Sequence, residues 1–333
     1  MATKTKLLNN IGAVTDALDV MMEKDKNVVV YGEDTGFEGG VFRATQGLQK
    51  KYGVDRCFDT PIQESSLVGS GIGAAVAGLK PVVEMQFSGF SLYGLAQLFG
   101  NAARLRNRSR GVTTVPMVLR MPCGGGVKAL EHHSESVEAL FAHIPGLKVV
   151  MPSTPKDTKG LLISAIEDPD PVVFLEHKRD YRAFKEEVPE GYYKVEIGKA
   201  RVVVPGEELT VVTYGHMVHE TLAALKKLRE QGKDYSVEVI DLRTIKPLDT
   251  KTIIESVKKT GRLLAVSEAV TYGSINTEVI ARVNEEAFDD LLAAPRRLNG
   301  PDITIPLPVL ENLFMVDANK IAMEIDDMLK DAE

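Results

Sequence analysis

The chain has 333 residues, a net charge of −7 and no Trp, and 44% of its residues are hydrophobic. It is long enough for two domains, and its acidic balance argues against nucleic acid or an anionic membrane as a partner. Residues 1–10 lack the apolar run of a signal peptide, and no apolar stretch is long enough to span a membrane. Cys57 and Cys123 form no metal-binding motif, which fits a reducing compartment. We therefore expect a cytoplasmic globular protein.

Helix and strand patterns alternate through the first half of the chain. Apolar residues at helical spacing predict helices, and short apolar runs predict strands that are buried in a parallel sheet. The expected helices cover residues 11–24, 44–52, 61–79, 91–108, 137–141 and 156–167. The expected strands cover residues 28–31, 81–87, 115–120, 147–151 and 172–175, with one more ending at Phe58. Pro61 suits the first position of its helix, and Ser134 suits an N-cap.

The alternation stops at residues 181–196, a charged stretch with Pro and Gly that we interpret as an interdomain linker. A second series of elements follows it. The expected strands cover residues 209–213, 236–241, 263–267 and 296–299, and the expected helices cover 216–231, 250–259, 275–288 and 318–329. The sequence thus predicts an α/β protein with two parallel-sheet domains, at residues 1–185 and 197–333.

The stretch 58–79 combines a carboxylate with a helix that has a stripe of small residues. Glu64 lies in the first turn, and Gly69, Gly73 and Ala77 follow at intervals of four. Two interpretations of Glu64 stay open. It either faces water, favoured by the helix dipole, or lies at a close-packed interface, where burial would raise its pKa. In the second case Glu64 is suited to transfer a proton.

Other polar side chains follow strands of the first predicted sheet. Glu33 and Gln86 come at strand ends, and His132 and His133 follow a glycine-rich loop. Because the carboxyl ends of parallel strands meet at one edge, we expect these side chains to converge there with Glu64. The alternative is that Glu33 only caps a loop. One of two adjacent histidines is expected to point away.

Phosphate-binding motifs are missing from the sequence. It has no G-x-G-x-x-G, no G-x-x-x-x-G-K-[ST], and no Gly-Asp-Gly followed by an Asn that would hold a metal and a diphosphate. A cofactor bound by this chain is therefore expected to contact it through an end without phosphate.

Four long stretches resemble the beta subunits of thiamine-diphosphate-dependent 2-oxo acid dehydrogenases, nearest to the bacterial pyruvate type. The resemblance extends over essentially the whole chain. Its stretches are Gly32–Asp34 with Gly39–Arg43, Phe58–Glu64, His133–Ser134 with His143–Val150, and Pro152–Pro155 with Lys159–Leu162. The resemblance implies an N-terminal pyrimidine-binding thiamine-diphosphate fold and a C-terminal transketolase-like domain with an assembly role.

The resemblance also implies roles for single residues. Glu64 matches the family glutamate that hydrogen-bonds the aminopyrimidine ring of thiamine diphosphate, although Ser70 replaces an apolar residue of that motif. The cofactor needs this carboxylate because its pyrimidine must exchange a proton before the thiazolium carbon can react. His133 matches the active-site histidine, with His132 supporting it. Further cofactor contacts are implied at Glu33, Ile62, Gln86 and Phe90.

Partners and ions are implied in the same way. In the family an alpha subunit holds the diphosphate and magnesium, within a heterotetramer of two alpha and two beta subunits. A dihydrolipoyl acyltransferase with a lipoyl domain accepts the acyl group. A structural potassium site, made mainly of carbonyl oxygens, would map to Met117, Ala165, Asp168 and Asp170. The family often has Asn at the last of these positions.

The resemblance favours the beta subunit of an acetyl-transferring pyruvate dehydrogenase, which decarboxylates pyruvate oxidatively and passes the acetyl group to the lipoyl group. Branched-chain 2-oxo acid and acetoin dehydrogenases are alternatives with similar beta subunits. A split transketolase or sugar-phosphate synthase should show basic residues for a sugar phosphate. A catalytically silent assembly scaffold is the alternative of another class, and Glu64 and His133 count against it.

Overall fold

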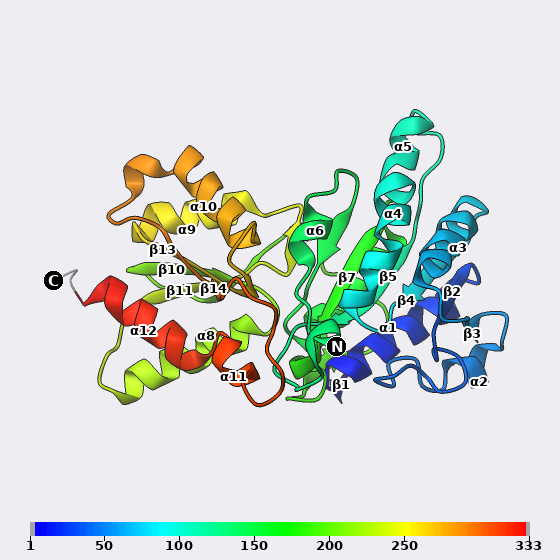
Figure 1. Ribbon diagram of the computed structural model, residues 1–333, viewed down its shortest axis with the longest axis horizontal. Helices are drawn as coiled ribbons and strands as arrows, with labels where there is room; N and C mark the ends of the chain where they lie inside the picture. The colour runs from blue at the N-terminus through cyan, green and yellow to red at the C-terminus, as the bar shows by residue number, and fades with distance from the viewer. Residues whose placement is uncertain (1–3, 331–333) are drawn as a thin grey trace.

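Two sheets lie side by side, one formed mainly by the first half of the chain and the other by the second (Figure 1). The computed structural model describes residues 4–330. Within this range the first sheet has seven strands, in the order β12 (Thr244–Lys246), β6 (Lys148–Val150), β7 (Val172–His177), β5 (Val118–Cys123), β4 (Lys80–Glu84), β2 (Val28–Gly32) and β3 (Cys57–Asp59). All of them run parallel except β12.

Helices cover both faces of the first sheet. One face packs against α1 (Asn10–Lys24), α2 (Leu48–Tyr52) and α7 (Pro155–Glu167), and the other against α3 (Glu64–Val76), α4 (Ser91–Gly100) and α6 (Glu138–Ala142). Along β2, Val28 and Val30 pack with the residues of α1 and α7 on one face. Val29 and Tyr31 pack with those of α3 and α4 on the other face. This alternation buries every residue of the strand, which explains its unbroken apolar run.

The second sheet repeats this arrangement. Its order is β14 (Arg296–Gly300), β13 (Leu263–Val270), β10 (Leu209–Thr213), β11 (Val237–Asp241) and β9 (Arg201–Val204). Among the described strands of this sheet, β9 alone runs antiparallel to its neighbour. One face packs against α9 (Thr250–Thr260) and α10 (Ile275–Glu286), and the other against α8 (Met217–Glu230) and α12 (Ala318–Leu329). The short helix α11 (Glu311–Phe314) lies between β14 and α12.

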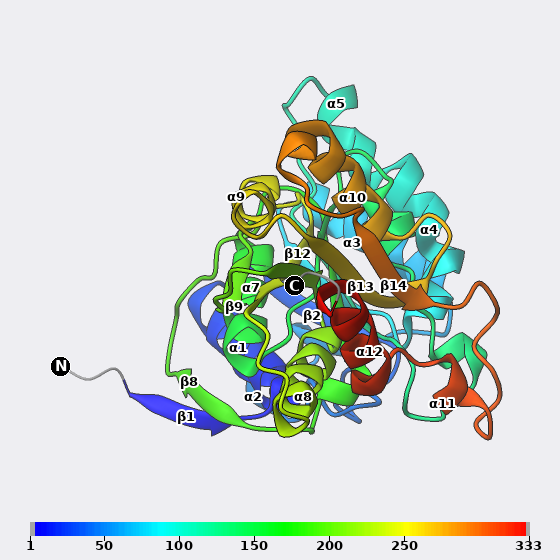
Figure 2. The same cartoon turned by 90° about the vertical axis from the view of Figure 1, so that its left-hand side faces the viewer.

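The two halves of the chain interlock. Strand β12 comes from the second half, yet it pairs antiparallel with β6 at the edge of the first sheet. One apolar cluster runs through both halves, since it contains Val149 of β6 together with Val212 of β10 and Ile240 of β11. The segment predicted as a linker contains β8 (Glu186–Pro189), which pairs with β1 (Thr5–Leu8) in a separate two-stranded ribbon (Figure 2).

Several element boundaries differ from those predicted. The helix expected over 91–108 breaks after Gly100, because Asn101 leaves the helical conformation, and α5 (Leu105–Arg108) follows as a separate turn. The expected helix start at Pro61 is wrong, since α3 begins at Glu64. Ser134 is not an N-cap, because Val137 occupies that position before α6.

Two further differences concern polar segments. Residues 44–47 form turns instead of helix, and α2 begins only at Leu48, after Gly47 with a φ of 85°. Strand β9 escaped prediction because it is an edge strand whose residues are only partly buried. No helix in the described residues is long and apolar enough to cross a membrane.

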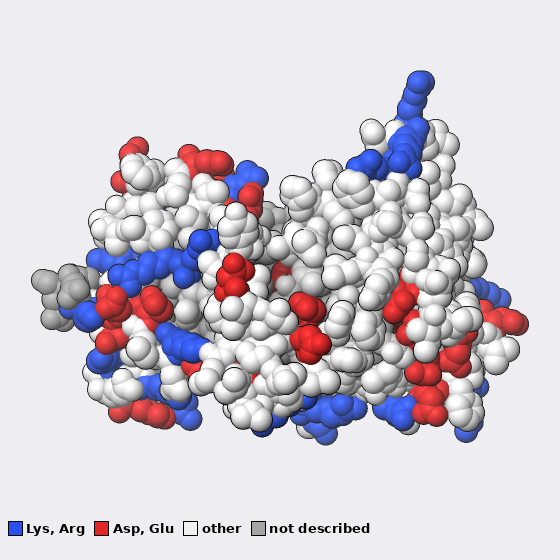
Figure 3. Space-filling model, in the orientation of Figure 1, with Lys and Arg blue, Asp and Glu red and all other residues white. Residues whose placement is uncertain are grey.

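Basic side chains gather at the projecting end of α5 (Figure 3). Arg106 pairs with Asp170 at 2.6 Å, and the guanidinium of Arg104 lies 4.1 Å from the centre of the Phe99 ring. These contacts hold Arg106 and Arg104 against neighbouring parts of the chain.

Arg120 lies at the centre of a buried ionic network in the first sheet. Its guanidinium donates to Glu84 of β4 at 2.6 Å, and to Glu176 of β7 at 2.7 and 2.9 Å. The Tyr181 hydroxyl donates to the same Glu176 carboxylate at 2.7 Å. Burial and the charge of Glu176 raise the pKa of Glu84, and Arg120 opposes that rise. The single positive charge of Arg120 on β5 therefore links this strand to the carboxylates of its two neighbours, β4 and β7.

We predict that Arg120→Met destabilises the chain by about 3–5 kcal/mol, because two carboxylates stay buried without their counter-charge. The loss should shrink as the pH falls, since protonated carboxyls need no counter-charge. Chemical denaturation of the isolated chain at several pH values measures both effects. Arg282→Met is the matched control, because the exposed, water-screened Arg282–Glu278 pair should contribute little to stability. Equal, small losses in both variants would contradict the role of Arg120.

Candidate functional site

The loops after β2, β4 and β5 meet at the edge of the first sheet where the parallel strands have their carboxyl ends. Glu33 directly follows β2, and Gln86 lies just beyond β4. Phe90 ends the 3-10 helix η1 (Ser88–Phe90), and His133 ends η3 (Glu131–His133) in the loop after β5. The sheet thus supplies a shared platform for residues that are up to 100 positions apart in the sequence.

Glu33 is a buried carboxyl with an unused oxygen. Its side chain is only 3% exposed, and its Oε1 has no hydrogen-bond partner within the described residues. Burial, together with the negative charges of Glu64 and Asp34, raises the pKa of Glu33, while the backbone N–H of Gln63 partly opposes the rise. Glu64 begins α3 and is half-buried. The negative charge of Glu64 therefore acts on the buried Glu33 carboxyl at the sheet edge.

Two aspartates that the sequence analysis did not single out as site residues fix the surrounding loops. The Asp59 carboxylate accepts hydrogen bonds from the backbone N–H groups of Gly36 at 2.6 Å and Phe37 at 3.0 Å. Gln86 donates its amide to Asp34 at 2.9 Å. The signal for Asp34 was available, because it directly follows Glu33 at the strand end. Asp59 could not be found this way, since its partners are backbone groups of a distant loop.

His133 is held by two aromatic rings. Its imidazole packs edge-to-face on Phe87, with 4.4 Å between ring centres, and on Phe90, with 5.3 Å. Its Nδ1 is buried and has no hydrogen-bond partner in the part of the chain that is described. His132 is exposed, with its ring tilted over Phe90 at 6.3 Å. Of the two histidines, His133 is the one with a ring nitrogen ready for a ligand.

Gly89 brings the loops after β4 and β5 into close contact. A Cβ atom at this position would lie 2.4 Å from the backbone carbonyl oxygen of His132. The Ser88 hydroxyl adds a hydrogen bond to the Glu135 carbonyl at 2.8 Å. The position of η3, and with it His133, therefore depends on a glycine that the sequence analysis did not identify.

One side of the site is open. Ile62 is 81% exposed, and no described residue lies within 4 Å of where a Cβ of Gly73 would stand. A Cβ on Gly69 would meet nothing nearer than the Gln97 side chain at 3.7 Å. The small residues Gly69 and Gly73 thus leave open space along the face of α3, the helix that Glu64 begins.

The predicted potassium residues lie at the opposite edge of the sheet. Met117 precedes β5, and its carbonyl accepts a hydrogen bond from the Val172 N–H at 3.0 Å. The Ala165 carbonyl accepts one from Asp168 at 3.3 Å. The carboxylates of Asp168 and Asp170 already pair with Lys148 and Arg106. A potassium ion there would have to be bound by the carbonyl oxygens, and that site remains a prediction.

Two family models match the chain. The model described as the transketolase pyrimidine-binding domain matches residues 7–183, and the one described as the transketolase C-terminal domain matches residues 198–321. The predicted fold class, an α/β protein with two transketolase-like domains, is confirmed.

Curated relatives match nearly the full length. The pyruvate dehydrogenase E1 component subunit beta of Acholeplasma laidlawii is 56% identical, over 97% of this chain and 98% of that protein. The subunit of the same name from Bacillus subtilis (strain 168) is 50% identical, over 92% and 93%. The 2-oxoisovalerate dehydrogenase subunit beta of the same bacterium is 48% identical, over 95% and 96%.

A solved structure has the same fold. It is described as a split gene transketolase in an inactive beta4 tetramer, and it superposes with a TM-score of 0.76 over 96% of this chain and 97% of that one. The sequence identity is 19%, so this likeness concerns the fold alone.

Proposed function

The chain belongs to the family of E1 component beta subunits with transketolase-like domains, and on this premise we propose that it is the beta subunit of an acetyl-transferring pyruvate dehydrogenase. The proposed reaction is the oxidative decarboxylation of pyruvate, with transfer of the acetyl group to the lipoyl group of a dihydrolipoyl acyltransferase. Support for pyruvate comes from the higher identity to the Acholeplasma pyruvate subunit, 56%, than to the 2-oxoisovalerate subunit, 48%.

The observation that supports a cofactor site best is a pair of unused buried atoms at one sheet edge. These are Oε1 of Glu33 and Nδ1 of His133. The loop after β4 connects their two loops, because its Gln86 bonds Asp34 next to Glu33 and its Phe87 packs on His133. Buried polar atoms without partners are uncommon in folded proteins, and a bound ligand would supply partners for these two. The aminopyrimidine of thiamine diphosphate offers donors and acceptors of the required kind.

When bound, thiamine diphosphate supplies the nucleophilic carbon and the electron sink for decarboxylation. The residues of this chain orient it and transfer protons. Glu64 would exchange a proton with the pyrimidine nitrogen through its carboxylate, while Glu33 supplies a second hydrogen-bonding group. Phe90 and Ile62 offer apolar surface to the ring. His133, fixed by Phe87 and Phe90, would give or take a proton on the substrate side.

An alpha subunit completes this proposed site. The chain lacks a diphosphate motif, and the side of α3 with Gly69 and Gly73 is open, which suits an approaching backbone. We propose that the alpha subunit holds the diphosphate and magnesium in a heterotetramer of two alpha and two beta subunits. The acyltransferase would meet the assembled enzyme with its lipoyl domain.

Reconstitution with an E1 alpha subunit tests the proposed function. The isolated chain should bind thiamine diphosphate only weakly and should be inactive. The reconstituted complex should bind it with magnesium and should turn over pyruvate with a higher kcat/KM than 3-methyl-2-oxobutanoate. Calorimetry and steady-state kinetics measure these quantities. Tight binding by the isolated chain would refute the shared site, and a preference for the branched substrate would refute the assignment of pyruvate.

Replacing His133 should separate its role from that of His132. Because general acid–base groups contribute about 10²- to 10⁴-fold, His133→Ala should lower turnover of the complex on that scale. His132→Ala is the matched control, and it should reduce turnover much less, since its ring is exposed. The melting temperatures of both variants should stay near that of the wild type. Equal, small effects on turnover would argue against a catalytic role for His133.

A further inference from the structure

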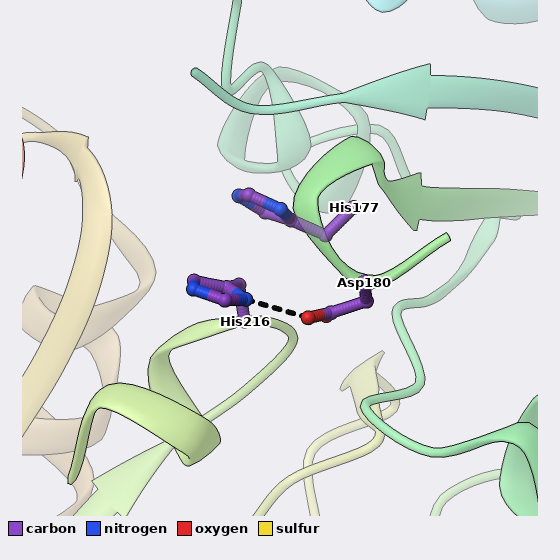
Figure 4. Close-up of side chains that lie close together, drawn as sticks. All are labelled: His177, Asp180 and His216. Atoms are coloured by element: carbon purple, nitrogen blue, oxygen red, sulfur yellow. Dashed lines mark hydrogen bonds and ion pairs between the residues drawn. The ribbon is translucent and has the colours of Figure 1, made fainter. Parts of the chain in front are cut away.

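A second cluster of chemically capable side chains lies where the first sheet meets the second half of the chain. His177 ends β7, Asp180 ends the 3-10 helix η4 (Lys178–Asp180), and His216 directly precedes α8 (Figure 4). Their exposed fractions are 3%, 2% and 8%. One ring nitrogen or carboxylate oxygen of each lies within 4.8 Å of those of the other two. The cofactor mechanism proposed above uses none of them.

Each histidine has one ring nitrogen fixed by a carboxylate. Nε2 of His177 lies 3.0 Å from Glu268, and Nε2 of His216 lies 3.2 Å from Glu220. A carboxylate on the far nitrogen is the usual companion of a metal-binding histidine, because it fixes the ring and makes the other nitrogen more basic. In both residues the remaining ring nitrogen, on the other side of the ring from that carboxylate, is Nδ1.

The Nδ1 atoms of both histidines lie near the Asp180 carboxylate, and not every polar atom of this group has a full set of hydrogen bonds. Nδ1 of His177 accepts only a long contact of 3.3 Å from the Arg179 backbone among its described partners. Nδ1 of His216 lies 2.5 Å from Oδ1 of Asp180. The other oxygen, Oδ2, is buried and has no hydrogen-bond partner in the described chain. A buried carboxylate oxygen without a partner is an independent sign of a missing ligand.

We propose that Nδ1 of His177, Nδ1 of His216 and the Asp180 carboxylate bind a divalent cation of the zinc class. Two imidazoles and a carboxylate are a ligand set that zinc accepts, with a fourth position left for water or the second Asp180 oxygen. Bonds of about 2.1 Å place tetrahedral ligand atoms roughly 3.4 Å apart. The most widely separated ligand atoms therefore need to approach by no more than about 1.4 Å. Nδ1 of His216 and Oδ1 of Asp180, which are 2.5 Å apart, need to separate by about 0.9 Å when the cation enters.

Without a cation, a proton on His216 can bridge this histidine and Asp180. Burial lowers the pKa of His216, but hydrogen bonds to Asp180 and Glu220 outweigh it and raise the pKa to about 9. The cation would replace that proton between His216 and Asp180. Arg179 already pairs with Glu220 at 2.7 Å, so its charge is balanced outside the ligand set.

The cation would tie the two halves of the chain together. His177 ends β7 of the first sheet and Asp180 lies three residues later, whereas His216 precedes α8, a helix that packs on the second sheet. Glu268 of β13 already spans this junction, because it also accepts the Gly125 N–H at 2.5 Å. A metal here would therefore add a structural bond between the halves, independent of the proposed enzymatic function.

Titration of the EDTA-treated full-length chain with Zn²⁺ tests the proposal. Calorimetry should show one Zn²⁺ bound per chain, and Co²⁺ should give the visible absorption of a tetrahedral site. Zn²⁺ should also raise the melting temperature, because it binds only the folded chain. His216→Asn and Asp180→Asn should each weaken binding about 100-fold or more and abolish the shift in melting temperature.

His219→Asn is the matched control on the same helix. Nε2 of His219 bonds the Ser153 carbonyl at 2.8 Å and lies 4.0 Å from Oδ1 of Asp180, so it contacts the cluster without belonging to the ligand set, and this variant should bind Zn²⁺ like the wild type. Asp180→Asn keeps the side-chain shape, and circular dichroism of the metal-free variants verifies that they fold. Absence of stoichiometric binding, or unchanged binding in both ligand variants, would reduce the cluster to a hydrogen-bond network and overturn the proposal.

Discussion

The buried Arg120 network is the constraint on which the positions of the catalytic loops depend. Arg120 joins β4 and β7 through Glu84 and Glu176, so the strands that end at the site are held by charge as well as by the ladder. The loop after β2 also packs on this network. A Cβ on Gly40 would lie 2.7 Å from Oε1 of Glu84, at a φ of 80° that glycine adopts readily. The loop that begins at Glu33 is thereby positioned over the same carboxylate.

On the proposed function, the site is half of a binding pocket that an alpha subunit completes. The chain supplies carboxyl groups, aromatic surface and a fixed imidazole, but it has no phosphate-binding motif and leaves the face of α3 open at Gly69 and Gly73. Such a division explains how polar atoms of Glu33 and His133 can stay without partners in a stable fold. Their partners are expected from the cofactor and from the second subunit.

The sequence predicted the parts of the fold that periodicity controls. The helix over 318–329 and the strand over 209–213 match the structure, because an apolar face or an unbroken apolar run defines each of them. The strand β12 was missed because it depends on pairing with the distant β6, and the break after Gly100 was missed because apolar spacing continues through the local change of conformation at Asn101. Within the site, the strand ends indicated Glu33 and Gln86. Asp59, Phe87 and Gly89 were not identified, because their roles exist only once separate loops meet.

The assignment of Glu64 as the proton-exchanging group is tested most directly by hydrogen exchange. Glu64→Gln keeps the volume of the side chain and a hydrogen bond, but it cannot pass a proton. In the reconstituted complex with thiamine diphosphate, deuterium exchange at the thiazolium carbon should slow by about 10²- to 10⁴-fold in this variant. Assembly and cofactor affinity should stay near wild type. Exchange at the wild-type rate would contradict the assignment and leave Glu64 as a carboxylate that only begins a helix.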